Sequence, residues 1–250
     1  DRLRSRGLGD VYKRQIEKFL EMVQESDNIV FFGGAGVSTE SGIPDFRSVD
    51  GLYNQKYDYP PETILSHTFY MRHTEEFYRF YRDKMLCLDA KPNVTHQKLA
   101  ELEAAGKVKA VITQNIDGLH QMAGSRRVLE LHGSVHRNYC QKCGKGFDAE
   151  YILKSGTEIP LCDACGGKIK PDVVLYEEGL NQQTLEDAVF YISHADVLII
   201  GGTSLNVYPA AGLIQYFNGK YLVLINKSET PVDRKADIVI HDSIGKVLSN

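Results

Sequence analysis

The sequence predicts an α/β fold in which a mainly parallel β-sheet is covered by helices on both faces. Short apolar runs rich in Val and Ile recur along the chain, and segments with helical spacing of apolar residues lie between them. This alternation is typical of parallel sheets, whose strands are joined by crossover helices. The 250 residues, 42% of them hydrophobic, are enough for one large domain or for a large domain with a smaller one.

The first half of the chain begins with a predicted helix. Four apolar residues between Ile16 and Val23 are spaced to share one helical face, which predicts a helix over residues 16–24. An apolar run predicts the first strand over 28–32. Beyond it, composition and spacing predict a loop at 51–61, helices at 74–88 and 95–105, and strands at 108–113 and 128–131.

The second half resumes this alternation after an irregular stretch. Residues 137–170 contain paired Cys, Gly and Lys residues and show no strand or helix period. After them we expect strands at 173–176, 197–200, 221–225 and 238–240, and helices at 184–193 and 210–217.

The charge balance argues against a nucleic-acid-binding surface. The formal net charge is −4 and the pI is about 6.1, whereas such surfaces are strongly basic. No apolar run approaches the roughly 20 residues that a membrane span needs. We therefore expect neither a nucleic-acid partner nor a membrane partner, and the sequence leaves the oligomeric state open.

Residues 1–15 differ in character from the rest of the chain. The stretch from Ser5 to Gln15 resembles the translation of an adaptor used in transposase-based sequencing libraries. We therefore expect a non-native segment at 1–15, with natural sequence beginning near Ile16. The alternative is a genuine basic, disordered N-terminal arm.

Four of the five Cys residues form two tight pairs. Cys140 and Cys143 are separated by 18 residues from Cys162 and Cys165. This spacing predicts a four-thiolate zinc ribbon, and the alternative is a redox dithiol. Because all four positions of a tetrahedral ion would be filled, the zinc should be structural. We expect the fifth, Cys87, to be a core residue of an apolar helix.

Two Gly-containing segments follow the first strand. Residues 34–38, Gly-Ala-Gly-Val-Ser, should open a helix and could bring backbone N–H groups close to a pyrophosphate. The common dinucleotide fingerprint has a third Gly where this chain has Thr39, so a simple tight turn remains the alternative. Farther on, Phe46 and Arg47 could cover a ring and a phosphate, or Phe46 could merely anchor a surface loop.

A group of polar residues follows the strand predicted at 108–113. Gln114, Asn115 and Asp117 come directly after it, and His132 follows the next strand. The carboxyl edge of an open α/β sheet is where ligands bind. Amides can hold sugar hydroxyls, and a His side chain can accept a proton near neutral pH. The alternative is a polar turn after a buried strand.

Taken together, these motifs resemble those of the sirtuins, the NAD-dependent protein lysine deacylases. The matching segments occur in order over residues 16–250: they are 34–38, 42–47, 113–117, 132–133, the four Cys, 202–205 and 225–226. The resemblance implies a Rossmann-like NAD-binding domain formed by 16–47, 93–136 and 171–250. It also implies a smaller module made of a helical insertion at 48–92 and a zinc-ribbon insertion at 137–170.

The resemblance also assigns roles to individual residues. NAD, consumed as a co-substrate, would contact Ala35, Thr39, Phe46, Arg47, Gln114, Asn115, Ile116, Asp117, His132, Thr203, Ser204, Asn226 and Asp242. His132 would be the general base and Asn115 a second catalytic residue. Val174, Tyr176 and Glu178 would bind an acetylated lysine peptide, and the four Cys would hold one Zn²⁺. By analogy, the enzyme would be cytoplasmic and of bacterial or archaeal type.

The implied chemistry transfers an acyl group from lysine to ADP-ribose. The acyl oxygen attacks the sugar carbon as nicotinamide leaves, and His132 then removes a proton from a ribose hydroxyl that attacks the intermediate. One alternative is a mono-ADP-ribosyltransferase on the same scaffold. Another is a noncatalytic NAD-sensing or zinc-ribbon module, which the polar residues at 115, 117 and 132 argue against.

One departure from the family, and one comparison within it, concern the substrate. Many members have Phe-Gly-Glu where this chain has Tyr176, Glu177 and Glu178, and the added negative charge suggests a preference for peptides with basic flanks. Members that prefer acidic acyl groups carry Tyr-x-x-Arg, whereas this chain has Tyr78 and Tyr81. An acetyl or longer neutral acyl group is therefore expected, although the aromatic cluster around residue 78 could equally be core.

Overall fold

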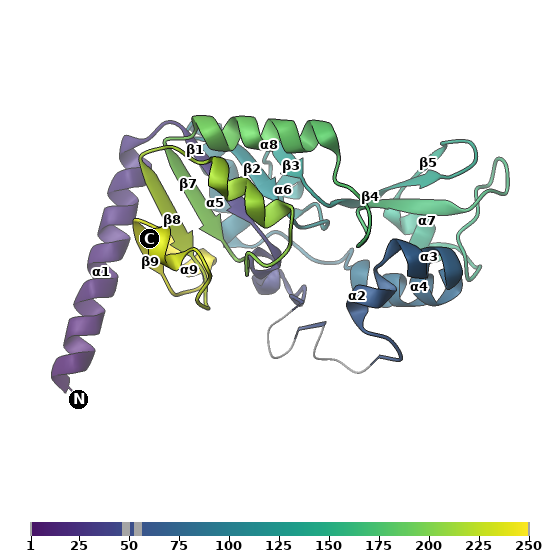
Figure 1. Cartoon of the computed structure of the whole chain (residues 1–250), viewed down its shortest axis with the longest axis horizontal. Helices are drawn as coiled ribbons and strands as arrows, with labels where there is room; N and C mark the ends of the chain where they lie inside the picture. Colours follow the sequence, from purple (N-terminus) through teal and green to yellow (C-terminus); the bar gives the residue numbers. More distant parts are fainter. Residues whose placement is uncertain (1, 47–50, 53–56, 250) are drawn as a thin grey trace.

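A computed structural model describes residues 2–46, 51–52 and 57–249, with side-chain environments given from residue 11 onwards. It contains a larger sheet on one side and a smaller three-stranded sheet on the other, joined near β4 (Figure 1). The predicted fold class is confirmed: the larger sheet is parallel throughout, and helices lie on both of its faces.

The larger sheet has the strand order β3-β2-β1-β7-β8-β9. Its strands are β1 (Ile29–Gly33), β2 (Val108–Thr113), β3 (Val128–Glu130), β7 (Val197–Gly201), β8 (Tyr221–Ile225) and β9 (Ile238–Ile240). The chain moves outward from β1 in one direction and later returns to continue in the other, so the order reverses between β1 and β7. Open α/β sheets bind ligands at this reversal.

The two faces of this sheet bury alternate side chains of the same strands. In β1, Phe31 packs with helices α1 (Arg2–Glu25), α5 (Val94–Ala104) and α9 (Ile244–Leu248). Its neighbour Phe32 packs with α8 (Gln182–His194) and the 3₁₀ helix η5 (Ala210–Tyr216) on the other face. Burial on both faces explains why these strands are continuously apolar and do not alternate with polar residues.

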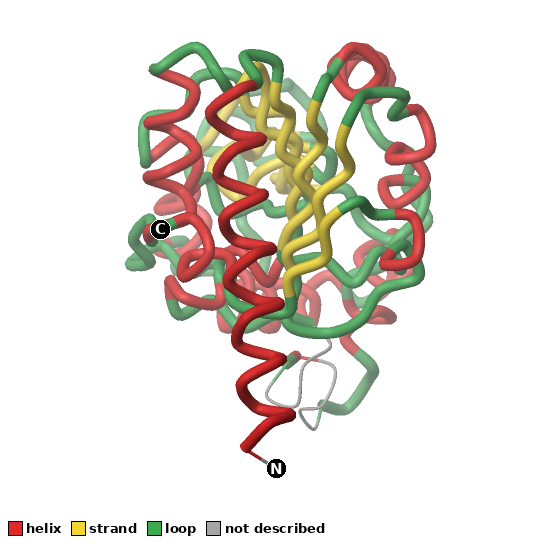
Figure 2. Tube along the Cα trace, turned by 90° about the vertical axis from the view of Figure 1, so that its left-hand side faces the viewer, coloured by secondary structure: helices red, strands yellow, loops and turns green. Residues whose placement is uncertain are grey.

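Helix α1 is longer than the predicted helix at 16–24. Ile16 and Phe19 are buried against the sheet, and the helix continues back to residue 2, so that its N-terminal part extends beyond the sheet (Figure 2). Residues 2–15, predicted to be non-native, are therefore helical here. Among the described residues, no helix combines the length and apolar character that crossing a membrane requires.

The smaller module contains the antiparallel sheet β5-β4-β6. Its strands are β4 (Gly133–Cys140), β5 (Gly146–Phe147) and β6 (Ile169–Val173), and its helices are α2 (Pro61–Ile64), α3 (His67–Arg72), α4 (Thr74–Phe80), the π-helical turn η4 (Tyr81–Met85) and α7 (Ala149–Lys154). Residues from both predicted insertions share its core. The sheet nevertheless extends on both sides of 137–170, because β4 begins at 133 and β6 ends at 173.

Several sequence predictions need correction. The strand predicted at 173–176 is β6 at 169–173, and β4 was not predicted. The helix predicted at 74–88 ends at Met85, and the segment predicted as a helix at 210–217 is 3₁₀, with helix-weakening Gly212 at its centre. The remaining elements, α6 (Leu119–Met122), η1 (Ala35–Val37), η2 (Thr39–Ser41) and η6 (Asp233–Lys235), are short.

Candidate active site

A cleft of about 1030 Å³ lies at the carboxyl ends of β1, β2 and β7 and extends to the smaller module. Its volume is at the upper end of the range usual for small-molecule sites. The structure brings most of the predicted site residues to this cleft: Ala35, Thr39, Phe46, Gln114, Asn115, Ile116, Asp117, His132, Val174, Tyr176, Glu178, Thr203, Ser204, Asn226 and Asp242. Arg47, also predicted, lies outside the described residues.

The glycine turn after β1 opens two short 3₁₀ turns, η1 and η2, and not the predicted helix. It therefore lacks the extended helix N-terminus on which the anion-site argument rested. Its glycines permit a close backbone contact, because a Cβ on Gly36 would lie 2.8 Å from the Cα of Gly202. Gly202 has a φ of +60° and follows β7. The two turns at the strand-order reversal thus pack directly on each other.

The polar residues after β2 are fixed by hydrogen bonds to this glycine turn. Asn115 Nδ2 donates to Ser38 Oγ at 3.0 Å, and Ser38 Oγ donates to Asp117 Oδ2 at 2.6 Å. Asp117 Oδ1 accepts the Leu119 N–H at 2.9 Å. These bonds hold an amide and a carboxylate side by side at the cleft floor, where they could bind a ligand amide.

His132 has one ring nitrogen engaged by the protein. Its Nδ1 lies 3.0 Å from the carbonyl oxygen of Gln114. A carbonyl can only accept, so Nδ1 carries the proton and the lone pair of the neutral ring is on Nε2. Burial lowers the pKa of His132, partly offset by the bond to Gln114. The ring is therefore neutral at pH 7, as a proton acceptor must be.

The predicted ribose and adenine residues come from the ends of β7, β8 and β9. Thr203 Oγ1 accepts from Gln114 Nε2 at 3.0 Å, which connects the β2 and β7 ends of the cleft. Asn226 Nδ2 donates to Ser228 O within its own loop. Burial raises the pKa of Asp242, but the hydrogen bonds that its carboxylate accepts from Lys246 and from Tyr12 Oη at 2.8 Å outweigh this effect, so the pKa is lowered.

The segment 174–178 forms one wall of the cleft. The Val174 N–H donates to His132 O, and the Tyr176 N–H donates to Leu65 O, so the segment bridges the two modules. A turn closes from Glu178 N–H to Leu175 O, and its third residue, Glu177, has a φ of +75°. The Glu178 carboxylate faces inward and is bonded by His67, Lys170 and the Leu175 N–H.

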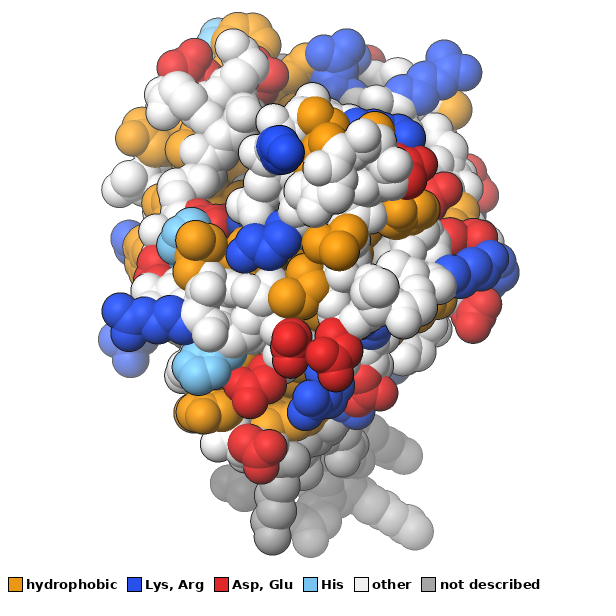
Figure 3. Space-filling view, turned by 90° about the vertical axis from the view of Figure 1, so that its right-hand side faces the viewer, with side chains coloured by type: hydrophobic (Ala, Val, Ile, Leu, Met, Phe, Trp, Pro, Cys, Tyr) orange, Lys and Arg blue, Asp and Glu red, His pale blue; other side chains and the backbone are white. Residues whose placement is uncertain are grey.

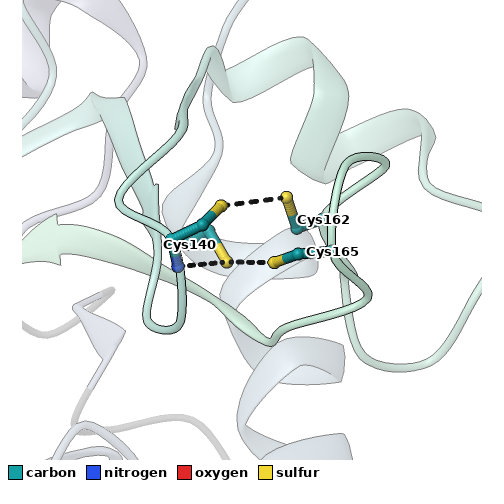
Figure 4. Close-up of side chains that lie close together, drawn as sticks. Cys140, Cys162 and Cys165 are labelled. Carbon is teal, nitrogen blue, oxygen red and sulfur yellow. Dashed lines mark hydrogen bonds between the residues drawn. The ribbon is translucent and has the colours of Figure 1, made fainter.

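The four predicted zinc ligands converge. Their Sγ atoms all lie within 4.8 Å of one another, with Cys140 3.4 Å from Cys165 and Cys143 3.6 Å from Cys162. These separations are close to the ~3.8 Å edge of a tetrahedron with Zn–S bonds of about 2.3 Å. Figure 4 shows Cys162 and Cys165 turned towards Cys140 from an opposing loop. The donor set therefore fits Zn²⁺.

One expectation about an apolar residue is revised, and one alternative left open by the sequence is decided. Cys87 lies beyond the end of η4 and lines the cleft, so it is not a residue of a helix core. Tyr78 and Tyr81 are completely buried in the core of the smaller module and do not line the cleft. That aromatic cluster is core. Of the helical insertion, Lys84, Met85 and Leu88 line the cleft instead of these two tyrosines.

Sequence analysis did not single out two polar residues that hold the site together. Ser38, 1% exposed, bonds both Asn115 and Asp117, and the only signal for it was a small polar residue at the end of the glycine motif. His136 Nε2 contacts the Asp117 carbonyl oxygen at 2.9 Å. No signal was available for His136, because β4 was not predicted.

Known proteins are similar to this chain over most of its length. The model of the Sir2 family matches residues 34–209. A protein from Clostridium acetobutylicum named NAD-dependent protein deacetylase is 64% identical over 94% of this chain and 96% of its own length, and one from Cutibacterium acnes is 54% identical over 93% and 96%. A structure of Sir2 with p53 peptide and NAD⁺ has a TM-score of 0.84 at 42% identity, covering 94% of this chain and 95% of that chain.

A second similar structure is that of a Sir2 variant with a His-to-Ala substitution. It contains Sir2 with deacetylated p53 peptide and 3′-O-acetyl ADP ribose, and it aligns with a TM-score of 0.87 at 42% identity, covering 94% of this chain and 96% of that chain.

Proposed function

The chain belongs to the Sir2 family, and from this premise we propose that it is an NAD-dependent protein deacetylase. It transfers an acetyl group from a lysine side chain to ADP-ribose and releases nicotinamide. One observation carries the proposal: His132 keeps its Nε2 lone pair available within a cleft that also contains Gln114, Asn115 and the bridging segment 174–178.

NAD would lie across the strand-order reversal. The nicotinamide amide would meet Asn115, Ile116 and Asp117, and its ribose would meet Gln114. Ala35, Thr39, Phe46 and Arg47 would line the nicotinamide and phosphate side. Thr203 and Ser204 would meet phosphate and ribose, Asn226 at the β8 end the adenine ribose, and Asp242 after β9 the adenine. The hydrogen bonds from Asn115 to Ser38 and from Ser38 to Asp117 support this placement. They fix the Asn115 and Asp117 side chains, which would bind the nicotinamide amide, before the ligand arrives.

The reaction needs no strong acid, because nicotinamide leaves as a neutral molecule from a cationic precursor. The acetyl oxygen of the substrate forms a bond to the sugar carbon that nicotinamide vacates. His132 Nε2 then accepts the proton of a ribose hydroxyl, and that oxygen attacks the former acetyl carbon. Water finally releases free lysine and acetyl-ADP-ribose. The Gln114 carbonyl keeps the imidazole oriented and stabilises the imidazolium that forms.

The acetylated peptide would add as an extended strand along 174–178, with Val174, Tyr176 and Glu178 as its neighbours. We also propose that Glu177 favours basic residues beside the acetyl-lysine. Its exposed carboxylate lines the cleft, and the Thr68 N–H bond and then His67 and Arg72 lower its pKa. It is therefore charged at neutral pH.

The expected selectivity is small. Exposed charge pairs contribute little, so peptides with Lys or Arg flanks should exceed matched Asp or Glu peptides about two- to fivefold in kcat/KM at low salt. The Glu177→Gln variant should lose this preference. Equal efficiencies in the unaltered enzyme would exclude this role for Glu177 without affecting the deacetylase proposal.

Product analysis tests the proposed function itself. The protein should convert NAD and an acetyl-lysine peptide into nicotinamide, deacetylated peptide and acetyl-ADP-ribose, identified by mass spectrometry. Peptide carrying ADP-ribose would indicate the mono-ADP-ribosyltransferase alternative, which no feature of the described site residues favours. One structural Zn²⁺ would be held by the four Cys. A cytoplasmic location stays a prediction.

The charge of the surface bears on the prediction about nucleic acid. At the end of the smaller module, coloured Lys and Arg side chains are interspersed with Asp and Glu (Figure 3). This face therefore presents a mixed surface, whereas nucleic-acid-binding surfaces are strongly basic. The absence of a nucleic-acid partner stays a prediction.

A further inference from the structure

The pairing of β4 with β6 is interrupted by a bulge next to the cleft. Ser134 pairs with Asp172, but the next pair along the strands is Asn138 with Pro171. Three residues of β4, Val135 to Arg137, therefore stand against a single step of β6. Bulges redirect side chains and are common beside active sites. We refer to these three residues as the 135–137 bulge.

Each residue of the 135–137 bulge bonds a different point of the larger domain. The Val135 N–H donates to Ile116 O at 3.0 Å. His136 Nε2 donates to Asp117 O at 2.9 Å, and its ring covers Gly118, where an added Cβ would lie 2.8 Å from Cδ2. The 135–137 bulge is thus hydrogen-bonded to the turn whose residues would bind the amide of nicotinamide.

Arg137 forms the third connection. Its Nη1 lies 2.7 Å from Glu130 Oε2 at the end of β3, and its Nε lies 2.8 Å from Asp172 Oδ2 in β6. The Glu130 side chain is only 9% exposed, and its other oxygen accepts from Gln121 Nε2 at 2.8 Å. A nearly buried carboxylate depends on such a partner, so this ion pair is more than a surface contact.

These contacts surround His132. Glu130 lies two residues before His132 and Asp172 pairs two residues after it, so Arg137 closes a ring around the short segment that crosses between the modules. We propose that the 135–137 bulge sets the distance between His132 and the Asp117 turn, with Arg137 as a positioning residue. The inference rests on the proposed deacetylase function, because His132 and the Asp117 turn would act together only in that reaction.

The consequence is a kinetic effect distinct from loss of stability. Catalytic groups must be held within a fraction of an ångström, and a displacement of about 1 Å can cost roughly 100-fold in rate. Arg137→Met should therefore lower kcat for acetyl-ADP-ribose formation about 10- to 100-fold and weaken inhibition by nicotinamide, with a smaller change in KM for the peptide. Arg137→Lys keeps a charge but not the two-pronged guanidinium, so its kcat should lie between those of the Arg137→Met variant and the unaltered enzyme.

The Glu130→Gln/Arg137→Met double variant separates positioning from stability. It removes the uncompensated buried charge, so its melting temperature should recover towards that of the unaltered protein. If Arg137 positions His132, its kcat and nicotinamide inhibition should remain impaired. Recovery of both with the melting temperature would overturn the proposal, as would an Arg137→Met enzyme with unaltered kcat and nicotinamide inhibition.

A matched control is available in the zinc ribbon. Lys145 pairs with Asp163 at 2.6 Å, both half-exposed and outside the cleft, so Lys145→Met should leave kcat and nicotinamide inhibition unchanged. The unaltered enzyme provides the second reference. If it forms no acetyl-ADP-ribose, the proposed function fails, whereas an active enzyme insensitive to Arg137→Met removes only the positioning role.

Discussion

The Gly133→Ala substitution adds one methyl group, but it should lower the free energy of unfolding strongly. Gly133 follows His132 and has a φ of +77°, where an L-residue is strained. An added Cβ would lie 1.9 Å from the carbonyl oxygen of Asp172, which belongs to the paired strand β6. Because backbone cannot rotate away as a side chain can, the substitution should separate β4 from β6.

The expected cost can be estimated from two contributions. The left-handed conformation costs roughly 1–2 kcal/mol, and overpacking adds about 1–3 kcal/mol, so the free energy of unfolding should fall by about 2–5 kcal/mol. Gly106→Ala is the matched control: its φ is +78°, but no atom lies within 4 Å of the added Cβ. It should lose only the conformational part.

Urea unfolding and steady-state kinetics would measure both effects. Gly133→Ala should also lose kcat, because Gly133 adjoins His132 and His132 O pairs with the Val174 N–H. Gly106→Ala should keep kcat, since Gly106 lies between α5 and the amino-terminal end of β2, whereas the cleft lies at the carboxyl end of β2. If the two variants unfolded at the same urea concentration and had equal kcat, the steric argument would be wrong.

Three further outcomes follow from the structure. Burial, with a smaller contribution from His96, lowers the pKa of His120 to about 3; the unfolded chain then binds the proton more tightly, so the free energy of unfolding should fall by roughly 1.4 kcal/mol per pH unit as the pH drops from about 6.5 towards 3. Urea titrations of His120→Phe should show a flatter pH dependence, and an unchanged slope would reject this assignment. Elemental analysis should find one zinc per chain, and Cys162→Ser should lose the zinc together with activity; full activity without zinc would contradict a structural metal. Deletion of residues 1–11 should leave kcat unchanged and shift the melting temperature by less than about 4 °C, since Val11 is half-exposed and Tyr12, which bonds Asp242, is retained; loss of NAD turnover would contradict the non-native assignment.

The sequence predicted the larger sheet well and the smaller one poorly, for a physical reason. Strands β7 and β8 are buried on both faces, so they appear as uninterrupted apolar runs such as Val197 to Ile200. Strand β4 contains Arg137 and Asn138, and its pairing is broken by the bulge. No period-two pattern survives in such a strand, and its partner β6 lies 29 residues or more along the chain.

Site residues that belong to a sequence motif could be predicted. Contacts that arise only when distant segments fold together could not. His132, Gln114 and Asn115 were identified by type and order, and all three line the cleft. The direction of the His132 ring could not be predicted, because it depends on the Gln114 carbonyl. Likewise, the replacement of the family's Gly by Glu177 predicted less backbone freedom and an added charge, but not the left-handed conformation that Glu177 adopts in a turn that favours Gly.

The most direct test of the central claim compares the unaltered protein with His132→Ala on NAD and an acetyl-lysine peptide. Loss of a general base typically costs about 10²- to 10⁴-fold, so acetyl-ADP-ribose formation should fall at least 100-fold. NAD binding by calorimetry should persist, and so should exchange of labelled nicotinamide, which precedes the proton transfer. A variant that formed acetyl-ADP-ribose within tenfold of the unaltered rate would contradict the role of His132 and, with it, this account of the cleft.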